Sequence, residues 1–106
     1  MPTPWTALAD PTRREVLERL RERPQAVGDL VAGLGLSQPT TSKHLRVLRE
    51  AGLVSVRPDA QRRVYAVDPR AFAELDAFLA PYRALWAESL DALGRRLNER
   101  ATEEER

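Results

Sequence analysis

The stretch Leu34–Leu53, LGLSQPTTSKHLRVLREAGL, predicts a tight turn followed by a helix over about Gln38–Ala51. Ser37 is a suitable N-cap, because its hydroxyl can accept an N–H of the first helical turn. Pro39 is tolerated in that turn, where its missing N–H costs little. Gly52 suits the position just past the last turn, and Leu53 supplies the hydrophobic contact that usually follows.

This helix has two different faces. Thr41, Leu45 and Leu48 recur at helical spacing and form the expected inner face. The other side carries short polar and cationic side chains, the types that contact base edges and phosphates: Thr40, Ser42, Lys43, His44 and Arg46. With a preceding helix over about Val27–Leu34 and a break at Gly35, the pattern is typical of a helix-turn-helix that binds DNA.

The N-terminal part predicts two further helices. A short one covers Trp5–Ala9, and a second begins with Asp10 as N-cap and Pro11 at its first position, then runs to about Glu22. Its expected inner face consists of Val16, Leu17 and Leu20. Arg13 and Arg14 leave two alternatives open, namely contacts to the DNA backbone or surface ion pairs with Asp10 or Glu18.

The pattern then changes to a β-type composition. Leu53–Arg57 and Arg63–Val67 predict two strands, with Pro58–Gln61 as the turn between them. A hairpin directly after the DNA-binding helix makes a winged helix. Its arginines, Arg57, Arg62 and Arg63, are expected to reach the DNA backbone or the minor groove.

Residues of about 70–100 return to a helical pattern, starting from Asp68 as N-cap and Pro69. Pro81 is expected either to split this region into two helices or to kink it. An apolar stripe runs along it that is longer than so small a domain needs. We therefore expect a homodimer, whose interface includes Trp5, Leu8, Phe78, Tyr82, Leu85, Trp86, Leu90 and Leu93. The alternative is that the stripe folds back onto its own domain.

The composition limits the class of protein. The 106 residues suffice for a single domain, 1–106, and neither a membrane span nor a signal peptide is expected, which favours a cytoplasmic protein. The chain has no cysteine, so it has neither disulfides nor thiolate metal sites. Residues 11–63 hold eleven Arg and Lys against six Asp and Glu, whereas residues 64–106 hold six against nine. A basic part beside an acidic one fits a nucleic-acid face.

Three segments together carry a resemblance to a known family. They are ALADPTRREVL (Ala7–Leu17), LSQPTTSKHLRVLREAGLV (Leu36–Val54) and RRVYAV (Arg62–Val67). The chain resembles the ArsR/SmtB-type winged-helix repressors over nearly its whole length. The resemblance implies a homodimeric bacterial repressor that binds palindromic operator DNA.

The sequence departs from the metal-sensing members of that family. Their motif Glu-Leu-Cys-Val-Cys-Asp-Leu corresponds to PQAVGDL here, so Ala26 and Gly28 stand where thiolates would be. The terminal helices contain no histidine, and the carboxylates of Asp76, Glu88 and Asp91 alone are poor ligands for a selective transition-metal site. The resemblance is therefore to the metal-independent branch, with no metal and no cofactor expected.

These observations predict a mainly α fold with a small two-stranded wing, a winged helix-turn-helix of about five or six helices that dimerises. The expected partners are double-stranded DNA and a second copy of the chain; any effector is unknown. The predicted DNA contacts are Gln38, Thr40, Thr41, Ser42, Lys43, His44, Arg46, Arg57, Arg62 and Arg63. Thr41 ranks lower because it lies on the inner face. No catalytic constellation is present, so an enzyme is not expected.

Two alternatives stay open. One is a repressor that senses a small molecule, or a metal held by carboxylates, at the dimer interface, where Trp5, Tyr82 and Trp86 are candidates for an effector pocket. The other is a winged-helix module that binds protein, although the polar and basic character of the helix face is against it.

Overall fold

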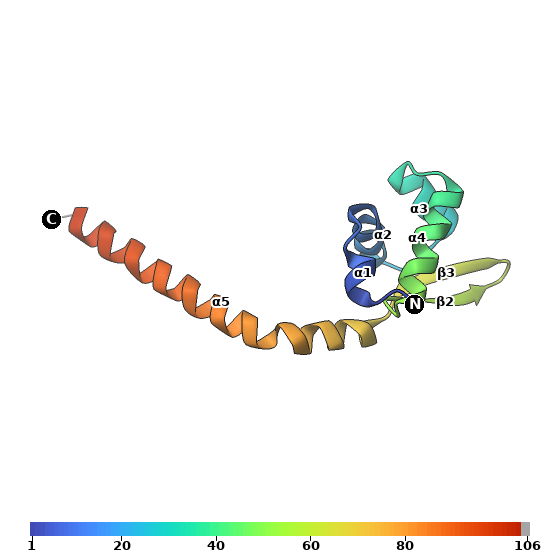
Figure 1. Ribbon diagram of the computed structural model, residues 1–106. Coiled ribbons are helices and arrows are strands. Elements are labelled where there is room, and N and C mark those ends of the chain that lie inside the picture. The colour runs from blue at the N-terminus through green and yellow to red at the C-terminus, as the bar shows by residue number, and fades with distance from the viewer. Residues whose placement is uncertain (105–106) are drawn as a thin grey trace. The chain divides into compact units, whose positions relative to one another are not determined.

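The computed structural model describes residues 1–104, which contain five helices and three short strands. Their order is α1 (Pro4–Leu8), α2 (Pro11–Glu22), β1 (Gln25–Ala26), α3 (Val27–Leu34), α4 (Gln38–Glu50), β2 (Val54–Asp59), β3 (Arg62–Val67) and α5 (Pro69–Glu104) (Figure 1). The helices α2, α3 and α4 followed by the β2–β3 hairpin make a winged helix-turn-helix, as predicted. The chain divides into two compact units, Met1–Glu74 and the part of α5 from Leu75 onward.

The helix starts follow from local capping. Asp10 Oδ1 accepts the N–H groups of Thr12 and Arg13 at 2.8 and 3.1 Å, which fixes the first turn of α2. Thr3 and Thr6 cap α1 reciprocally, so this helix begins at Pro4, one residue before the expected start. Asp68 accepts the N–H of Arg70 at 3.0 Å, and α5 begins at Pro69 as predicted.

Gly35 and Ser37 shape the turn between α3 and α4, as the sequence predicted. Gly35 ends α3 with φ of +67°, a left-handed conformation that suits glycine, and its N–H donates to the Val31 carbonyl at 3.0 Å. Ser37 then caps α4, because its Oγ accepts the N–H of Thr40 at 3.3 Å.

The core of the first unit lies where the three helices and the sheet meet. Its fully buried large side chains come from α2, α3, α4 and the segment that enters β2, and they are Val16, Leu30, Thr41, Leu45, Leu48 and Leu53. The predicted inner faces of α2 and α4 are therefore confirmed. Burial of the apolar side chains on these two faces stabilises the fold by roughly 25 cal/mol for each Å² of apolar surface removed from water.

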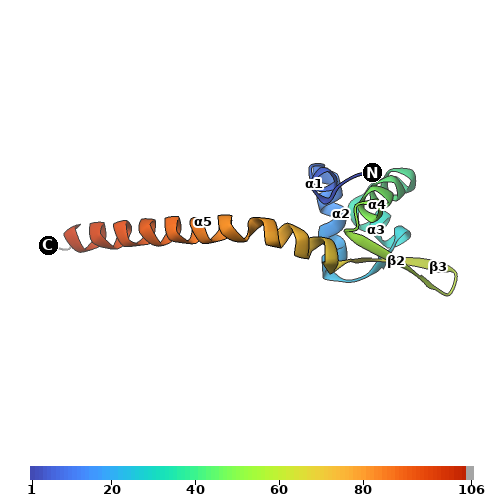
Figure 2. The same ribbon diagram turned by 60° about the horizontal axis from the view of Figure 1, so that its bottom comes forward.

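The wing differs from the prediction in two ways. It is a three-stranded antiparallel sheet of order β1–β3–β2, in which Gln25 of β1 pairs with Tyr65 of β3. Figure 2 shows its β2–β3 hairpin extending from the helices of the same unit. Only two residues form β1, too few for a composition signal, so the sequence did not reveal it. The hairpin is also longer, because Pro58 and Asp59 belong to β2, and Ala60 turns with φ of +55°. Pro58 is tolerated because β2 is an edge strand.

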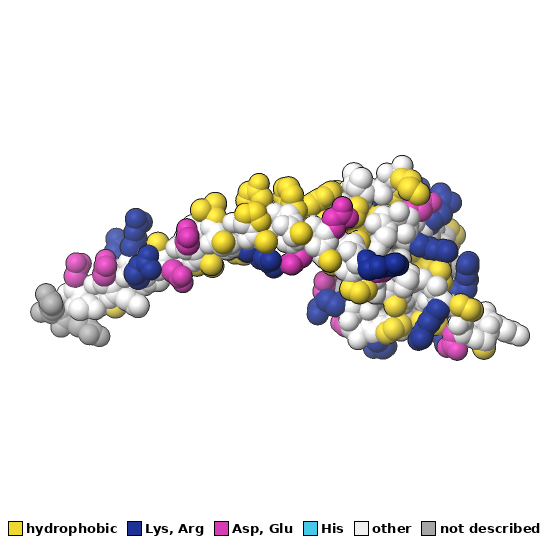
Figure 3. Space-filling model, turned by 90° about the horizontal axis from the view of Figure 1, so that it is seen from below, with side chains coloured by type: hydrophobic (Ala, Val, Ile, Leu, Met, Phe, Trp, Pro, Cys, Tyr) yellow, Lys and Arg dark blue, Asp and Glu magenta, His cyan; other side chains and the backbone are white. Residues whose placement is uncertain are grey.

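The helix α5 runs unbroken from Pro69 to Glu104 with Pro81 inside it. Of the two alternatives for Pro81, a split or a kink, the split into two helices is therefore wrong. Hydrophobic side chains gather along this helix (Figure 3). In the described part of the chain, no helix is both long enough and apolar enough to span a membrane.

Candidate nucleic-acid interface

Packing fixes which side of α4 faces outward. Thr41, Leu45 and Leu48 are completely buried. Because residues three and four apart share a helix face, the side chains between them must face solvent. The exposed positions are Gln38, Pro39, Thr40, Ser42, Lys43, Arg46 and Arg49, while His44 is half-buried. The predicted polar and basic face is thus presented as a continuous surface.

The chemistry of this face is uneven along the helix. At its start, the Ser37 hydroxyl donates to Thr40 Oγ1 at 2.8 Å, which holds the Thr40 hydroxyl in place. Further along, Ser42, Lys43 and Arg46 line a shallow hollow with Pro39. Arg46 lies 3.8 Å from Glu50 but keeps 76% of its side chain exposed, so its guanidinium stays accessible to a phosphate.

Thr41 is the one predicted contact that the structure places in the core. Its side chain has no exposed surface, and its hydroxyl donates to the Ser37 carbonyl at 2.9 Å. That bond satisfies the hydroxyl inside the protein. Thr41 therefore contributes to packing, and we leave it out of the set proposed to contact DNA.

The three wing arginines do not share one face. Across the β2–β3 ladder, Arg57 pairs with Val64 and Asp59 with Arg62, which puts these side chains on one side of the hairpin. Arg63 pairs with Pro58 and lies on the other side. Arg62 donates to Asp29 Oδ2 of α3 at 2.6 Å, an ion pair that sequence analysis missed because 33 residues separate its partners.

The two arginines at the start of α2 are occupied within the protein. Arg13 donates to the carbonyls of Thr6 and Ala7 at 3.4 and 3.2 Å and lies 3.5 Å from Asp10, so of the two alternatives left open for Arg13 the ion pair with Asp10 is the one observed. Arg14 donates to the Leu8 carbonyl at 2.8 Å. Both side chains thus tie α1 to α2, and neither enters the proposed DNA contacts.

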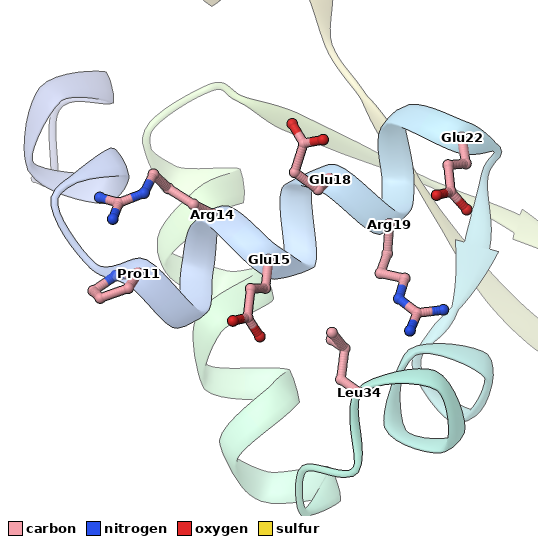
Figure 4. Close-up of a pocket in the computed structure, with 7 residues that line it drawn as sticks. All are labelled: Pro11, Arg14, Glu15, Glu18, Arg19, Glu22 and Leu34. Atoms are coloured by element: carbon pink, nitrogen blue, oxygen red, sulfur yellow. The ribbon is translucent and has the colours of Figure 1, made fainter.

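A hollow along α2 carries mixed charges (Figure 4). Glu15, Glu18 and Glu22 line it together with Pro11, Arg14, Arg19 and Leu34. Arg19 points toward α3 and donates to the Gly33 carbonyl at 2.7 Å. Because its carboxylates outnumber its cations, this surface is unsuited to a phosphate backbone.

Two carboxylates of this unit have perturbed acidity. Hydrogen bonds from the backbone N–H groups of Arg13 and Thr12, with the nearby Arg13 charge, lower the pKa of Asp10 against a smaller opposing effect of burial. The Arg70 guanidinium and its backbone N–H likewise lower the pKa of Asp68. Both groups are helix caps, so these shifts serve folding and not chemistry at the exposed α4 face.

The predicted dimerisation residues lie on exposed surfaces, apart from Leu8, which is half-buried. On α5, the exposed fraction is 57% for Tyr82, 61% for Leu85 and 65% for Trp86, and about half for Phe78, Leu90 and Leu93. Phe78 and Tyr82 pack with their ring centroids 5.5 Å apart. Trp5 of α1 is half-exposed. Among residues 1–104, no group of three or more His, Cys, Asp or Glu is placed to hold a metal ion.

A winged helix in which the second helix of the helix-turn-helix, here α4, presents an exposed polar and basic face defines a class of DNA-binding regulators. Residues 10–56, from the cap of α2 into β2, match the model of the arsR family of bacterial regulatory proteins. The chain is 45% identical over 94 residues to the HTH-type transcriptional regulator Rv2034 of Mycobacterium tuberculosis, covering 85% of this chain and 88% of that protein.

Two further similarities support the assignment. The transcriptional repressor SdpR of Bacillus subtilis is 31% identical over 64 residues, covering 60% of this chain and 71% of that protein. The solved homodimeric winged helix-turn-helix DNA-binding domain of Mb0332 from Mycobacterium bovis, a possible ArsR-family regulator, superposes with a TM-score of 0.61 at 28% identity. That match covers 74% of this chain and 72% of the other.

The chain therefore belongs to the ArsR family of bacterial transcriptional regulators. Its relatives are named regulators and repressors, which confirms the expectation that it is not an enzyme.

Proposed function

We propose that this protein is a homodimeric repressor that occupies palindromic operator DNA in the cytoplasm and excludes RNA polymerase. The observation that carries the proposal is the outward face of α4, where hydroxyl, amide and cationic side chains are exposed. The opposite face of the helix is buried and consists of Thr41, Leu45 and Leu48. Short polar side chains on a helix that can enter the major groove are suited to base edges. The repressor named SdpR and the homodimeric Mb0332 domain support both parts of the proposal.

Within this proposal, the contacts divide by chemistry. Gln38, Thr40, Ser42 and His44 contact bases or their immediate surroundings, because amides and hydroxyls match the donors and acceptors of base edges. Lys43 and Arg46 bind phosphates from α4, and the wing arginines Arg57, Arg62 and Arg63 bind phosphates or the minor groove.

The exposed stripe of α5 supports the dimer. Leucine and aromatic side chains recur along it at helical spacing, with Trp86, Leu90 and Leu93 about half exposed or more. A contiguous apolar surface of this kind is costly in water unless a partner covers it. A second copy, contacting α5 and Trp5 and Leu8 of α1, would cover it and place two α4 helices one DNA turn apart, about 34 Å.

The residues present do not fit the thiolate metal site of the family's metal sensors. Ala26, the N-cap of α3, and Gly28, inside α3, stand at the positions that the resemblance assigns to cysteines. The chain has no cysteine at all, and its single histidine is on α4. We therefore propose that the protein belongs to the metal-independent branch, and we assign no step of its function to a metal.

The test is fluorescence anisotropy with DNA from upstream of the gene and a scrambled duplex, across salt concentrations and with added zinc, copper or arsenite. Tighter, salt-sensitive binding to the upstream DNA that ignores all three additives supports a metal-independent repressor. Release by one of them would overturn metal independence and point to the carboxylates of α5. Absence of salt-sensitive binding to either duplex would overturn the DNA-binding role and favour a protein-binding module.

A further inference from the structure

Arg62 of the wing, which the proposed function assigns to a DNA contact, forms an ion pair with Asp29 of α3. Asp29 Oδ2 accepts from Arg62 Nη2 at 2.6 Å, and the same oxygen accepts the Ala26 N–H at 3.2 Å. The carboxylate is therefore anchored at the first turn of α3, where the helix dipole also favours a negative charge. Arg62 is thus paired with a carboxylate that also accepts a backbone hydrogen bond.

The pair remains open to competition. The side chains of Arg62 and Asp29 are 58% and 51% exposed, so water and a phosphate can both approach the guanidinium. Exposed pairs of this kind are weak, because solvent screens them and two side chains must be held in one geometry. A DNA phosphate offers the same acceptor chemistry as a carboxylate and forms bidentate bonds to arginine.

The ion pair with Asp29, and not the face alone, distinguishes Arg62 from the other wing arginines. Arg57, Asp59 and Arg62 lie on one face of the hairpin and line a hollow together with Asp29. Arg63 lies on the opposite face. Arg62 therefore already has a carboxylate partner in Asp29. Arg63 lies on the other side of the hairpin, away from that carboxylate.

We propose that Asp29 competes with DNA phosphates for Arg62 and thereby lowers the affinity of the wing for DNA of any sequence. In the free protein Arg62 is neutralised by Asp29, and on binding it exchanges the carboxylate for a phosphate. Because that exchange costs the ion pair, Arg62 contributes less to affinity than Arg63 does. This inference rests on the proposed DNA-binding function.

The exchange should change the affinity for DNA and leave the salt dependence nearly unchanged. A cation that neutralises a phosphate releases about 0.9 condensed counterion, which steepens the dependence of log K on log salt by that amount. Arg62 contacts a phosphate in the complex of wild type and of Asp29→Asn alike, so the slope should stay nearly unchanged between the two proteins. Freeing Arg62 from Asp29 in a dimer with two wings should instead tighten binding about three- to tenfold.

The experiment measures anisotropy of a scrambled duplex of about 30 base pairs with full-length wild type and with the variants Asp29→Asn, Arg62→Ala and Asp29→Asn/Arg62→Ala. Asparagine keeps an oxygen that can accept the Ala26 N–H, and thermal unfolding confirms that the variants fold. Asp59→Asn is the control for charge alone: it removes the same charge from the residue opposite Arg62 in the ladder, whereas Asp29 accepts a hydrogen bond from the Arg62 guanidinium. Arg63→Ala is the reference for a wing arginine on the other face.

The expected result is tighter binding by Asp29→Asn, little gain from Asp59→Asn, and no gain from Asp29→Asn once Arg62 is alanine. In the wild-type background Arg62→Ala should weaken binding less than Arg63→Ala. Unchanged or weaker binding by Asp29→Asn overturns the inference, as does an equal gain from Asp59→Asn or a gain that survives Arg62→Ala. A wild type that binds neither this duplex nor upstream DNA would instead contradict the proposed function.

Discussion

Leu53 donates its N–H to the Leu48 carbonyl at 2.9 Å, while the intervening Gly52 donates to Arg49 at 3.0 Å with φ of +79°. These two bonds close the C-terminus of α4 in a Schellman arrangement, and the left-handed residue falls on glycine. The chain then turns directly into β2, so the end of the proposed DNA-binding helix also sets where the wing begins.

Replacing Gly52 by alanine should therefore destabilise the fold by about 1 kcal/mol, because a Cβ is disfavoured at positive φ. A Cβ there would meet only the Ala71 side chain at 3.8 Å, an ordinary contact, so strain and not a clash is the cause. Gly28→Ala is the control, since nothing lies within 4 Å and alanine favours the helix. Chemical denaturation should show a loss for Gly52→Ala and no loss for Gly28→Ala. Equal stabilities would contradict the strain argument.

The lowered pKa values of Asp10 and Asp68 predict an acid-sensitive fold. A carboxylate whose folded-state pKa is below its ordinary value of 3.8 stabilises the fold above that value, and the contribution is lost as pH falls through the folded pKa. Changing both residues to Asn should lower Tm at pH 7, and this difference from wild type should shrink at pH 3 and below.

Circular dichroism melts at pH 7, 5 and 3 measure this difference, with Glu15→Gln, an exposed carboxylate of α2, as the control for charge removal. A gap in Tm that stays constant down to the lowest pH would show that the caps act through shape alone and not through their charge.

The proposed dimer makes a separate prediction. Trp86→Glu should convert the dimer into a monomer at micromolar concentration, because a charge would be buried in an apolar interface without a partner. Asp91→Lys, outside the apolar stripe, should leave the dimer intact. Sedimentation velocity distinguishes the two states. If Trp86→Glu sediments like wild type, the interface does not include this part of α5, and the homodimer must form elsewhere.

The features that the sequence predicted correctly are those that depend on residues close together in the chain. The caps Asp10, Ser37 and Asp68 and the spacing of buried residues on α2 and α4 sufficed for the helices, because their signals lie within a few residues. The sequence did not reveal β1, since Gln25 and Ala26 are a strand only through pairing with Tyr65 and Val64. The same holds for the site, where the exposed face of α4 followed from periodicity but the Asp29–Arg62 pair joins two elements distant in sequence.

The two kinds of DNA contact should separate in a mutational comparison. Ser42→Ala should weaken binding to upstream DNA by about fivefold per α4 helix, roughly the 1 kcal/mol of one hydrogen bond, and so by about 30-fold for the dimer, with little effect on a scrambled duplex. Arg63→Ala should weaken binding to both duplexes and reduce the salt slope by about one unit per wing, because a phosphate contact carries no sequence information. Anisotropy titrations at several salt concentrations measure both. A Ser42→Ala loss of equal size on both duplexes would place Ser42 on the phosphate backbone and not at a base edge.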